Sequence, residues 1–308
     1  MLMTKLCPGY IFMEKCGNIP ATNVIQILYL CGVNCQVFKN MRAFLYFSLT
    51  ALMVLSVSCN KNTPAPAPTV QLADCYLVKD HPVTGVTWEY TPGKFRSGAI
   101  RWDEHGRLYA VRLKDSEDEG TDYVFDYLKD SLVFYTRMYN ASEEVNIPSP
   151  ISIEEGYVKN FWTLVSLAPE VYALGLQCTF EGGHLVSKKF AEAEIPETYV
   201  WENGLLVSQI THDGNTWYYT YTDKPAKGGI AAMLLDEGPN AYSFASGYIQ
   251  GFCGIPLLPS KIEFQAKGST ERRVEYTFNY ETDADGYVTS MTYFQRTLGF
   301  EPAFTFTY

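Results

Sequence analysis

The feature that most constrains this chain is a two-residue alternation of apolar and polar side chains that recurs from Val86 onward. Val274, Tyr276, Phe278 and Tyr280 alternate with polar neighbours, and Trp217, Tyr219 and Tyr221 do the same. A period of two residues with one polar face is typical of half-buried antiparallel strands. Aromatic residues make up 15% of the 308 residues, a composition that favours β-structure.

Related turn motifs separate the alternating segments. The common form is an aromatic residue, an acidic residue, about two polar residues with glycine, and then a new alternating run of apolar residues. The copies lie in residues 100–108, 178–186, 200–207 and, more loosely, 283–288. Asn-Gly and Asp-Gly pairs supply the positive φ angles that tight hairpins need. Phe180 and Trp201 are 21 residues apart, close to one two-strand unit, which indicates stacked hairpins.

One internal region interrupts the alternation. Residues 229–236 and 241–249 read as short helices, so we predict a small helical insert near 229–251. The predicted fold is therefore all-β: a single antiparallel meander of about a dozen strands, curved into an open or partial barrel. The insert is expected to be a plug or lid on the concave face, or else an edge loop.

A second strong signal begins at Met41. Arg42 precedes an apolar run over residues 43–55, and Ser58 lies directly before Cys59. The run is shorter than the roughly 20 residues of a membrane span and fits the apolar region of a signal peptide. Residues 41–58 resemble a bacterial lipoprotein signal, which implies cleavage before Cys59 and lipidation of that cysteine.

The regions on either side of this signal follow from it. Residues 1–40 are expected to be a non-native upstream extension, with translation beginning at Met41; a second short apolar segment at residues 23–38 is the alternative. Residues 59–72 contain alternating prolines and are expected to form an extended, lipidated tether. Residues 73–308 then form the β-meander domain.

Together with the lipoprotein signal, the turn series resembles a known family. The turns are similar to the YD repeats of Rhs-type proteins. The whole chain resembles Bacteroidota lipoproteins whose domain of unknown function is described as porin-like, and the match covers most of residues 85–308. The resemblance implies a long, strongly curved antiparallel meander with an irregular or helical insert before residues 258–263. It implies no activity.

Composition and motifs exclude several functions. With 24 Lys+Arg against 34 Asp+Glu and a net charge of −10, the chain lacks the basic face that nucleic-acid binding needs. Asp283, Asp285 and Gly286 resemble the start of a calcium loop, but Thr292 replaces its bidentate glutamate, so we predict a hairpin turn. We predict no metal site, no cofactor and no enzymatic activity, because no nucleophile elbow, zinc helix or phosphate loop occurs.

The candidate binding residues are aromatic. Trp201, Trp217, Tyr219 and Tyr221 could form a platform for a sugar or an apolar ligand, although strand aromatics more often pack in a core. His184 and His212 lie at or beside predicted turns and are expected to be exposed and unimportant for binding. The exported compartment permits a disulfide, for which Cys178 and Cys253 are candidates, although spacing does not determine the pairing.

These observations leave several functional hypotheses. The leading one is a lipid-anchored, non-catalytic envelope protein that binds an apolar or glycan ligand or an envelope protein. The alternatives are a carrier for an acyl chain or lipid on a concave apolar face, an integral outer-membrane barrel, and an envelope hydrolase. In the Bacteroidota lipoproteins that the chain resembles, export to the cell surface is associated with acidic residues just after the lipidated cysteine. Asn60-Lys61-Asn62-Thr63 contains none, so the resemblance implies the periplasmic face of the outer membrane rather than the cell surface.

Overall fold

A computed structural model describes residues 70–115, 119–128, 131–140, 143–167, 170–236 and 238–308. The predicted upstream extension, the signal peptide, Cys59 and most of the tether lie outside these residues and stay predictions. The β-meander domain lies almost wholly within them, in a compact unit spanning Ala67–Tyr308.

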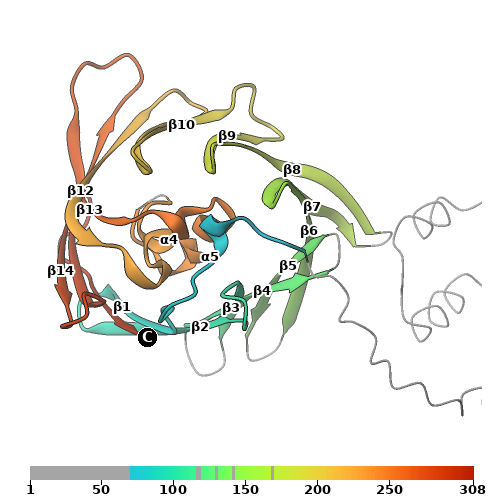
Figure 1. The fold of residues 1–308 in the computed structure, drawn as a ribbon, viewed down its shortest axis with the longest axis horizontal. Helices are drawn as coiled ribbons and strands as arrows, with labels where there is room; N and C mark the ends of the chain where they lie inside the picture. The colour runs from blue at the N-terminus through green and yellow to red at the C-terminus, as the bar shows by residue number, and fades with distance from the viewer. Residues whose placement is uncertain (1–69, 116–118, 129–130, 141–142, 168–169, 237) are drawn as a thin grey trace, which may run out of the picture. The chain divides into compact units, whose positions relative to one another are not determined.

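The described residues form sixteen strands that follow one another in a single closed antiparallel barrel (Figure 1). The strands are β1 (Gly85–Thr91), β2 (Lys94–Trp102), β3 (Leu108–Lys114), β4 (Gly120–Tyr127), β5 (Leu132–Tyr139), β6 (Glu144–Glu154), β7 (Tyr157–Leu167), β8 (Glu170–Glu181), β9 (His184–Phe190), β10 (Glu197–Glu202), β11 (Leu205–Ile210), β12 (Thr216–Pro225), β13 (Leu257–Gln265), β14 (Arg273–Thr282), β15 (Val288–Gln295) and β16 (Ala303–Thr307).

The all-β meander is confirmed, but its extent is corrected in two respects. The barrel has sixteen strands instead of about a dozen, and it is closed instead of open. Closure comes from β1 pairing with β16, in a register that places Gly85 opposite Thr307. The two strands are more than 200 residues apart, and such a contact leaves no local mark in the sequence.

The predicted hairpin turns are confirmed at all four motifs. Asn203 and Gly204 have φ of 52° and 78°, and Gly182 and Gly183 have φ of 56° and 89°, so both pairs fit the tight turn with two positive φ angles. In the Asp283 turn, the carboxylate Oδ1 accepts hydrogen bonds from the backbone N–H of Asp285 and of Tyr287. The acidic residue of that motif therefore stabilises its turn and needs no metal to explain it.

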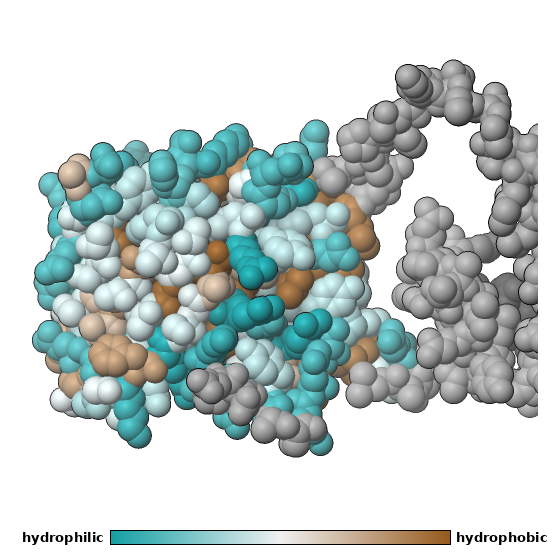
Figure 2. All heavy atoms as spheres, turned by 90° about the horizontal axis from the view of Figure 1, so that it is seen from below, coloured by the Kyte–Doolittle hydropathy of each residue, from teal (hydrophilic) through white to brown (hydrophobic). Residues whose placement is uncertain are grey.

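The two faces of the barrel wall differ in character. Inward-facing side chains such as Trp88, Phe134 and Phe304 are buried. The outer face carries ion pairs, including Arg112–Asp122 at 3.1 Å, Arg137–Glu144 at 3.1 Å and Lys261–Glu263 at 3.1 Å. Figure 2, seen from the side on which β1 and β2 lie, is mostly hydrophilic or neutral with scattered apolar residues.

The connection between β12 and β13 lies inside the ring of strands, and we call residues 226–256 the plug (Figure 1). It contains η2 (Lys227–Gly229), α4 (Ala231–Leu234), η3 (Ala241–Ser243), α5 (Phe244–Ile249) and η4 (Phe252–Gly254). The predicted helical insert is thus confirmed. Each residue of α4 is fully buried, so the plug forms the centre of the core. None of the helices in the described ranges is long and apolar enough to cross a membrane.

Residues 70–84, which we call the strap, run along one end of the barrel and contain η1 (Asp74–Tyr76). Backbone N–H groups of the strap donate to carbonyl oxygens of hairpin turns: Ala73 to Gly156 at 3.0 Å and Val78 to Gly106 at 2.8 Å. The strands alternate in direction. These turns, the connections to the plug, the start of β1 and the end of β16 therefore all lie at this end, which we call the strap rim. The opposite end is the far rim.

Candidate functional site

Among the described strands, the shortest ladder of the wall is at the joint between β9 and β10. It consists of two residue pairs, Glu197 with Lys188 and Thr198 with Ser187. Nearer the strap rim, side-chain contacts connect the two strands beyond the end of their backbone ladder. The indole Nε1 of Trp201 on β10 donates to the carbonyl oxygen of Leu185 on β9 at 2.7 Å. The Trp201 ring also stacks on His184 of β9, with centroids 4.5 Å apart.

A pocket of about 320 Å³ opens at this joint on the strap rim, and we call it the rim pocket. Trp201 and His184 form one side, Asp74 and Cys75 of the strap form another, and Gln250 of the plug lies among its lining residues. Gly183 and Gly204, from the two neighbouring hairpin turns, complete the opening. Its size is at the lower end of ligand pockets, so it suits a small molecule.

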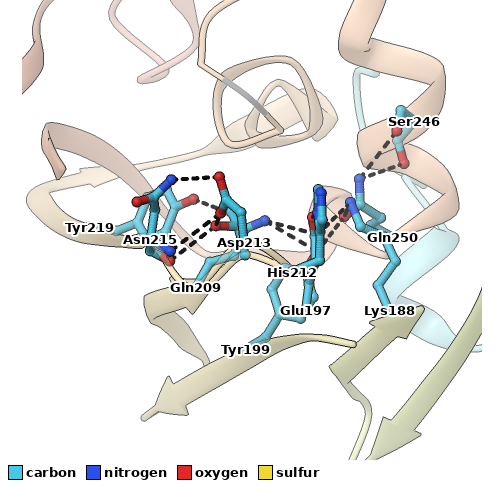
Figure 3. A network of polar contacts seen from close by, with 11 residues as sticks. Lys188, Glu197, Tyr199, Gln209, His212, Asp213, Asn215, Tyr219, Ser246 and Gln250 are labelled. Atoms are coloured by element: carbon cyan, nitrogen blue, oxygen red, sulfur yellow. Dashed lines mark hydrogen bonds and ion pairs between the residues drawn. The ribbon is translucent and has the colours of Figure 1, made fainter. Parts of the chain in front are cut away.

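A buried polar network made of Lys188, Glu197, Tyr199, Gln209, Tyr219 and Gln250 lies on the inner side of the same joint (Figure 3). Lys188 Nζ is 3.1 Å from Glu197 Oε2 and donates to Gln250 Oε1 at 3.2 Å. The Tyr199 hydroxyl also lies within hydrogen-bond distance of both acceptors. Two strands of the wall and the plug are therefore joined through one carboxylate and one amide.

The Glu197 carboxylate is almost fully occupied by partners from the barrel. Tyr199 and Gln209 donate to Oε2 at 3.0 and 3.2 Å, and Nδ1 of His212 lies 3.4 Å from Oε1. Burial raises the pKa of Tyr199 and that of Tyr219 well above the ordinary value, so both hydroxyls keep their protons and act as donors. The network is a satisfied structural cluster, in which a carboxylate and an ammonium share one buried site.

The structure separates the four aromatic residues that the sequence suggested. Trp201 lines the rim pocket. Trp217 packs inside against Phe264, with centroids 4.9 Å apart. Tyr219 is 8% exposed and donates to Gln209 Oε1, and the Tyr221 hydroxyl donates to the Leu206 carbonyl oxygen. Tyr219 and Tyr221 serve the wall, because their hydroxyls are bonded to residues of β11, and Trp217 packs against a residue of β13.

His184 is half-buried instead of exposed, and its ring stacks on that of Trp201. His212 is exposed as expected, with 53% of its side chain accessible, but it also contacts Glu197. No motif in the sequence pointed to Lys188, Glu197 or Gln250. A lysine facing inward on an alternating strand would have been the one available signal, because an inward charge requires a partner.

The candidate disulfide is corrected. Cys75, Cys178 and Cys253 are all free thiols. Cys178 lies on β8, whereas Cys253 lies in η4 within the plug. Burial raises the pKa of Cys75 and of Cys178 to about 12, which keeps both thiols protonated. Within the described ranges, no group of His, Cys, Asp and Glu side chains could hold a metal ion.

Comparisons with known proteins give structural likenesses only. No protein-family model and no curated protein matches the chain. A porin-like protein from Bacteroides vulgatus is 14% identical, with 74% of this chain and 99% of that chain covered at a TM-score of 0.47. A porin-like protein from Bacteroides uniformis is also 14% identical, with 73% and 97% covered at a TM-score of 0.41. The chain is thus similar to porin-like proteins of Bacteroides.

Proposed function

We propose that this chain is a lipid-anchored, non-catalytic protein of the outer membrane that binds a small neutral ligand, such as a sugar, in the rim pocket. The observation that carries the proposal is the stacked pair of Trp201 and His184 beside a pocket of about 320 Å³. An aromatic face suits the apolar face of a sugar ring. The Asp74 side chain, 96% exposed, is available as an acceptor for hydroxyl groups.

A binding role is favoured over catalysis by the state of the reactive groups. The Cys75 thiol in the pocket is protonated, because burial raises its pKa to about 12, so it is a poor nucleophile. The Glu197 carboxylate beneath the pocket already has four partners. Hydrolysis needs an acid or base that can reach the substrate, and neither Cys75 nor Glu197 meets that condition. Asp74 lies in water, without the desolvated surroundings typical of a catalytic carboxyl group.

A wall that faces water is favoured over one that faces lipid. The outer surfaces of β3 and β4 carry the Arg112–Asp122 ion pair, and β13 carries Lys261–Glu263. Membrane barrels instead present an apolar band to lipid, where a charge near the bilayer centre costs about 2–4 kcal/mol. We therefore assign membrane attachment to the lipid on Cys59 and place the barrel on the periplasmic face.

The anchor is tested with Cys59→Ser in the full chain, followed by fractionation without detergent. The wild-type protein should sediment with membranes, and the variant should either be released into soluble fractions or remain unprocessed; a processed variant that still sediments with membranes would refute the anchor. An integral barrel would leave both proteins in the membrane fraction. Protease treatment of intact cells then tests the periplasmic location, since a protein on the cell surface would be degraded.

The ligand site is tested by thermal-shift and tryptophan-fluorescence titration with neutral mono- and disaccharides, starting with N-acetylglucosamine and maltose. Binding should be lost in Trp201→Ala and kept in the matched variant Trp217→Phe, because Trp217 does not line the pocket. His184→Ala should weaken binding through loss of the stacked ring. A sugar that binds the Trp201→Ala variant as tightly as the wild type would refute this site.

A further inference from the structure

The inner faces of β5 and β6 become more exposed toward the far rim. In β5 the inward residues Leu132 and Phe134 are buried, whereas Met138 is 44% exposed. In β6 Ile151 is buried, whereas Val145 is 43% exposed. The register places Met138 opposite Val145, and Leu132 opposite Ile151, so all four side chains point into the barrel. Two apolar side chains inside a closed barrel are therefore accessible to solvent.

Aromatic rings extend this apolar surface from the plug toward Met138. Tyr248 of α5 packs on Phe125 at 5.3 Å, and Phe125 packs on Phe134 at 5.0 Å. Phe134 then contacts Tyr123 and Phe161, each at 5.7 Å. We call Tyr123, Phe134, Met138, Val145 and Phe161 the inner patch.

Charged residues are missing from the inward positions of β4, β5 and β6 that the structure describes. The register of β4, β5 and β6 assigns these positions to Thr121, Tyr123, Phe125, Tyr127, Leu132, Phe134, Thr136, Met138, Val145, Ile147, Ser149 and Ile151. The charges of these strands, such as Asp122 and Arg137, take the alternate outward positions. Among the described residues, the charge closest to the patch is Asp115, which acts on Tyr123 and is already paired with Arg96 at 3.1 Å. An ionic ligand would therefore meet a compensated pair at the edge of this surface.

The plug meets the edge of the patch through Tyr248, which packs on Phe125 at 5.3 Å, and other contacts of the plug lie to either side of the patch. Tyr242 of η3 packs against Trp88 of β1 and donates a hydrogen bond to Asp115, which follows β3. At the other side, Gln250 bonds to Lys188 of β9. The inner faces of β5 and β6 near the far rim lie between these two contact regions.

We propose that the inner patch binds a single acyl chain, which enters from the far rim. This second site is independent of the rim pocket, which opens at the other end of the barrel. Because the wall is closed, a folded partner or a second copy of the chain cannot reach the patch, whereas a slender chain can. From Phe134 to Met138 the strand rises roughly 13 Å, enough to lie along a medium-length acyl chain. Uncharged aromatic and aliphatic side chains then supply only apolar contact.

The test measures fluorescence of 1-N-phenylnaphthylamine bound to the purified full-length protein and its displacement by palmitate. Met138→Glu and Val145→Glu should each weaken palmitate binding about tenfold or more, because the acyl chain would desolvate the new carboxylate. Met138→Leu should bind as the wild type does. Monopalmitoyl phosphatidylcholine forms a second arm: displacement by both compounds identifies any acyl chain, and displacement by palmitate alone identifies free fatty acid.

Phe95→Glu is the matched control, since Phe95 is 60% exposed and lies opposite Glu89 on the outer face. It introduces the same charge without touching the patch, so its palmitate affinity should stay within about twofold of the wild type. Thermal melting must show that every variant is folded. The proposal is overturned if palmitate fails to displace the probe from the wild type, or if Phe95→Glu loses affinity as Met138→Glu does.

Discussion

At the residue scale, the pair formed by Lys188 and Glu197 is the most consequential interaction in the barrel wall. Each side chain is 7% exposed, and the pair joins the weakest strand joint to the plug through Gln250. A buried pair of this kind need not add net stability, yet removing one partner leaves an uncompensated charge. The pair therefore fixes the geometry of the joint more than it raises the free energy of unfolding.

Glu197→Gln should lower the free energy of unfolding by about 3–5 kcal/mol, because the Lys188 ammonium would lose its counter-charge inside the barrel. Lys188→Met should cost a similar amount for the opposite reason. The double variant should cost clearly less than the sum of the two, since neither charge then remains. Urea titration of the four proteins measures this coupling, and simple additivity would contradict it.

The cysteines give a second prediction at this scale. The Cys178 thiol is buried and its pKa is raised to about 12, and burial raises that of Cys253 still further. Both should resist maleimide at pH 8 in the native protein and react readily in urea, because only the thiolate is nucleophilic. Peptide mass mapping measures the extent of maleimide labelling at each cysteine separately. Equal labelling of Cys178 with and without urea would show that this wall is open to solvent.

At the element scale, the sequence predicts turns far better than it predicts their assembly. The Asn203-Gly204 and Asp283-Gly286 motifs determine their hairpins locally, because the glycine and acidic residues satisfy the turn by themselves. From the sequence, Trp201 can be recognised only as an aromatic residue on an alternating strand. The residues that it contacts, Leu185 and His184, belong to the neighbouring hairpin. Their contact with Trp201 depends on how β9 and β10 lie relative to each other.

The packing of α4 against α5 gives the prediction at this scale. An added Cβ on Gly247 would collide with the carbonyl oxygen of Ala232, so the two helices could not keep their present distance. Gly247→Ala should therefore lower the free energy of unfolding by about 1–3 kcal/mol or more, as overpacking does. Gly299→Ala is the control, because nothing lies within 4 Å of its added Cβ. Thermal melts compare the two, and equal stability would contradict this close packing.

At the scale of the whole molecule, closure is the property that the sequence conceals. The alternation predicts strands with one apolar face, and such strands can form either an open sheet or a barrel. The choice depends on β1 meeting β16 and on the plug filling the interior. Both are long-range contacts, and their formation costs loop-closure entropy that no local motif reveals.

The closed wall should open first where its ladder is shortest. β9 and β10 share two residue pairs, whereas β1 and β16 share four and β4 and β5 share eight. Local opening requires less free energy where fewer hydrogen bonds and buried contacts break together. Native-state hydrogen exchange should therefore be faster for amides of β9 and β10 that face each other than for those between β4 and β5. Glu197→Gln should accelerate exchange at this joint more than it does at the β1–β16 ladder. If the β1–β16 amides exchange first instead, the chain ends form the weak joint, and the polar network is not what holds the barrel closed.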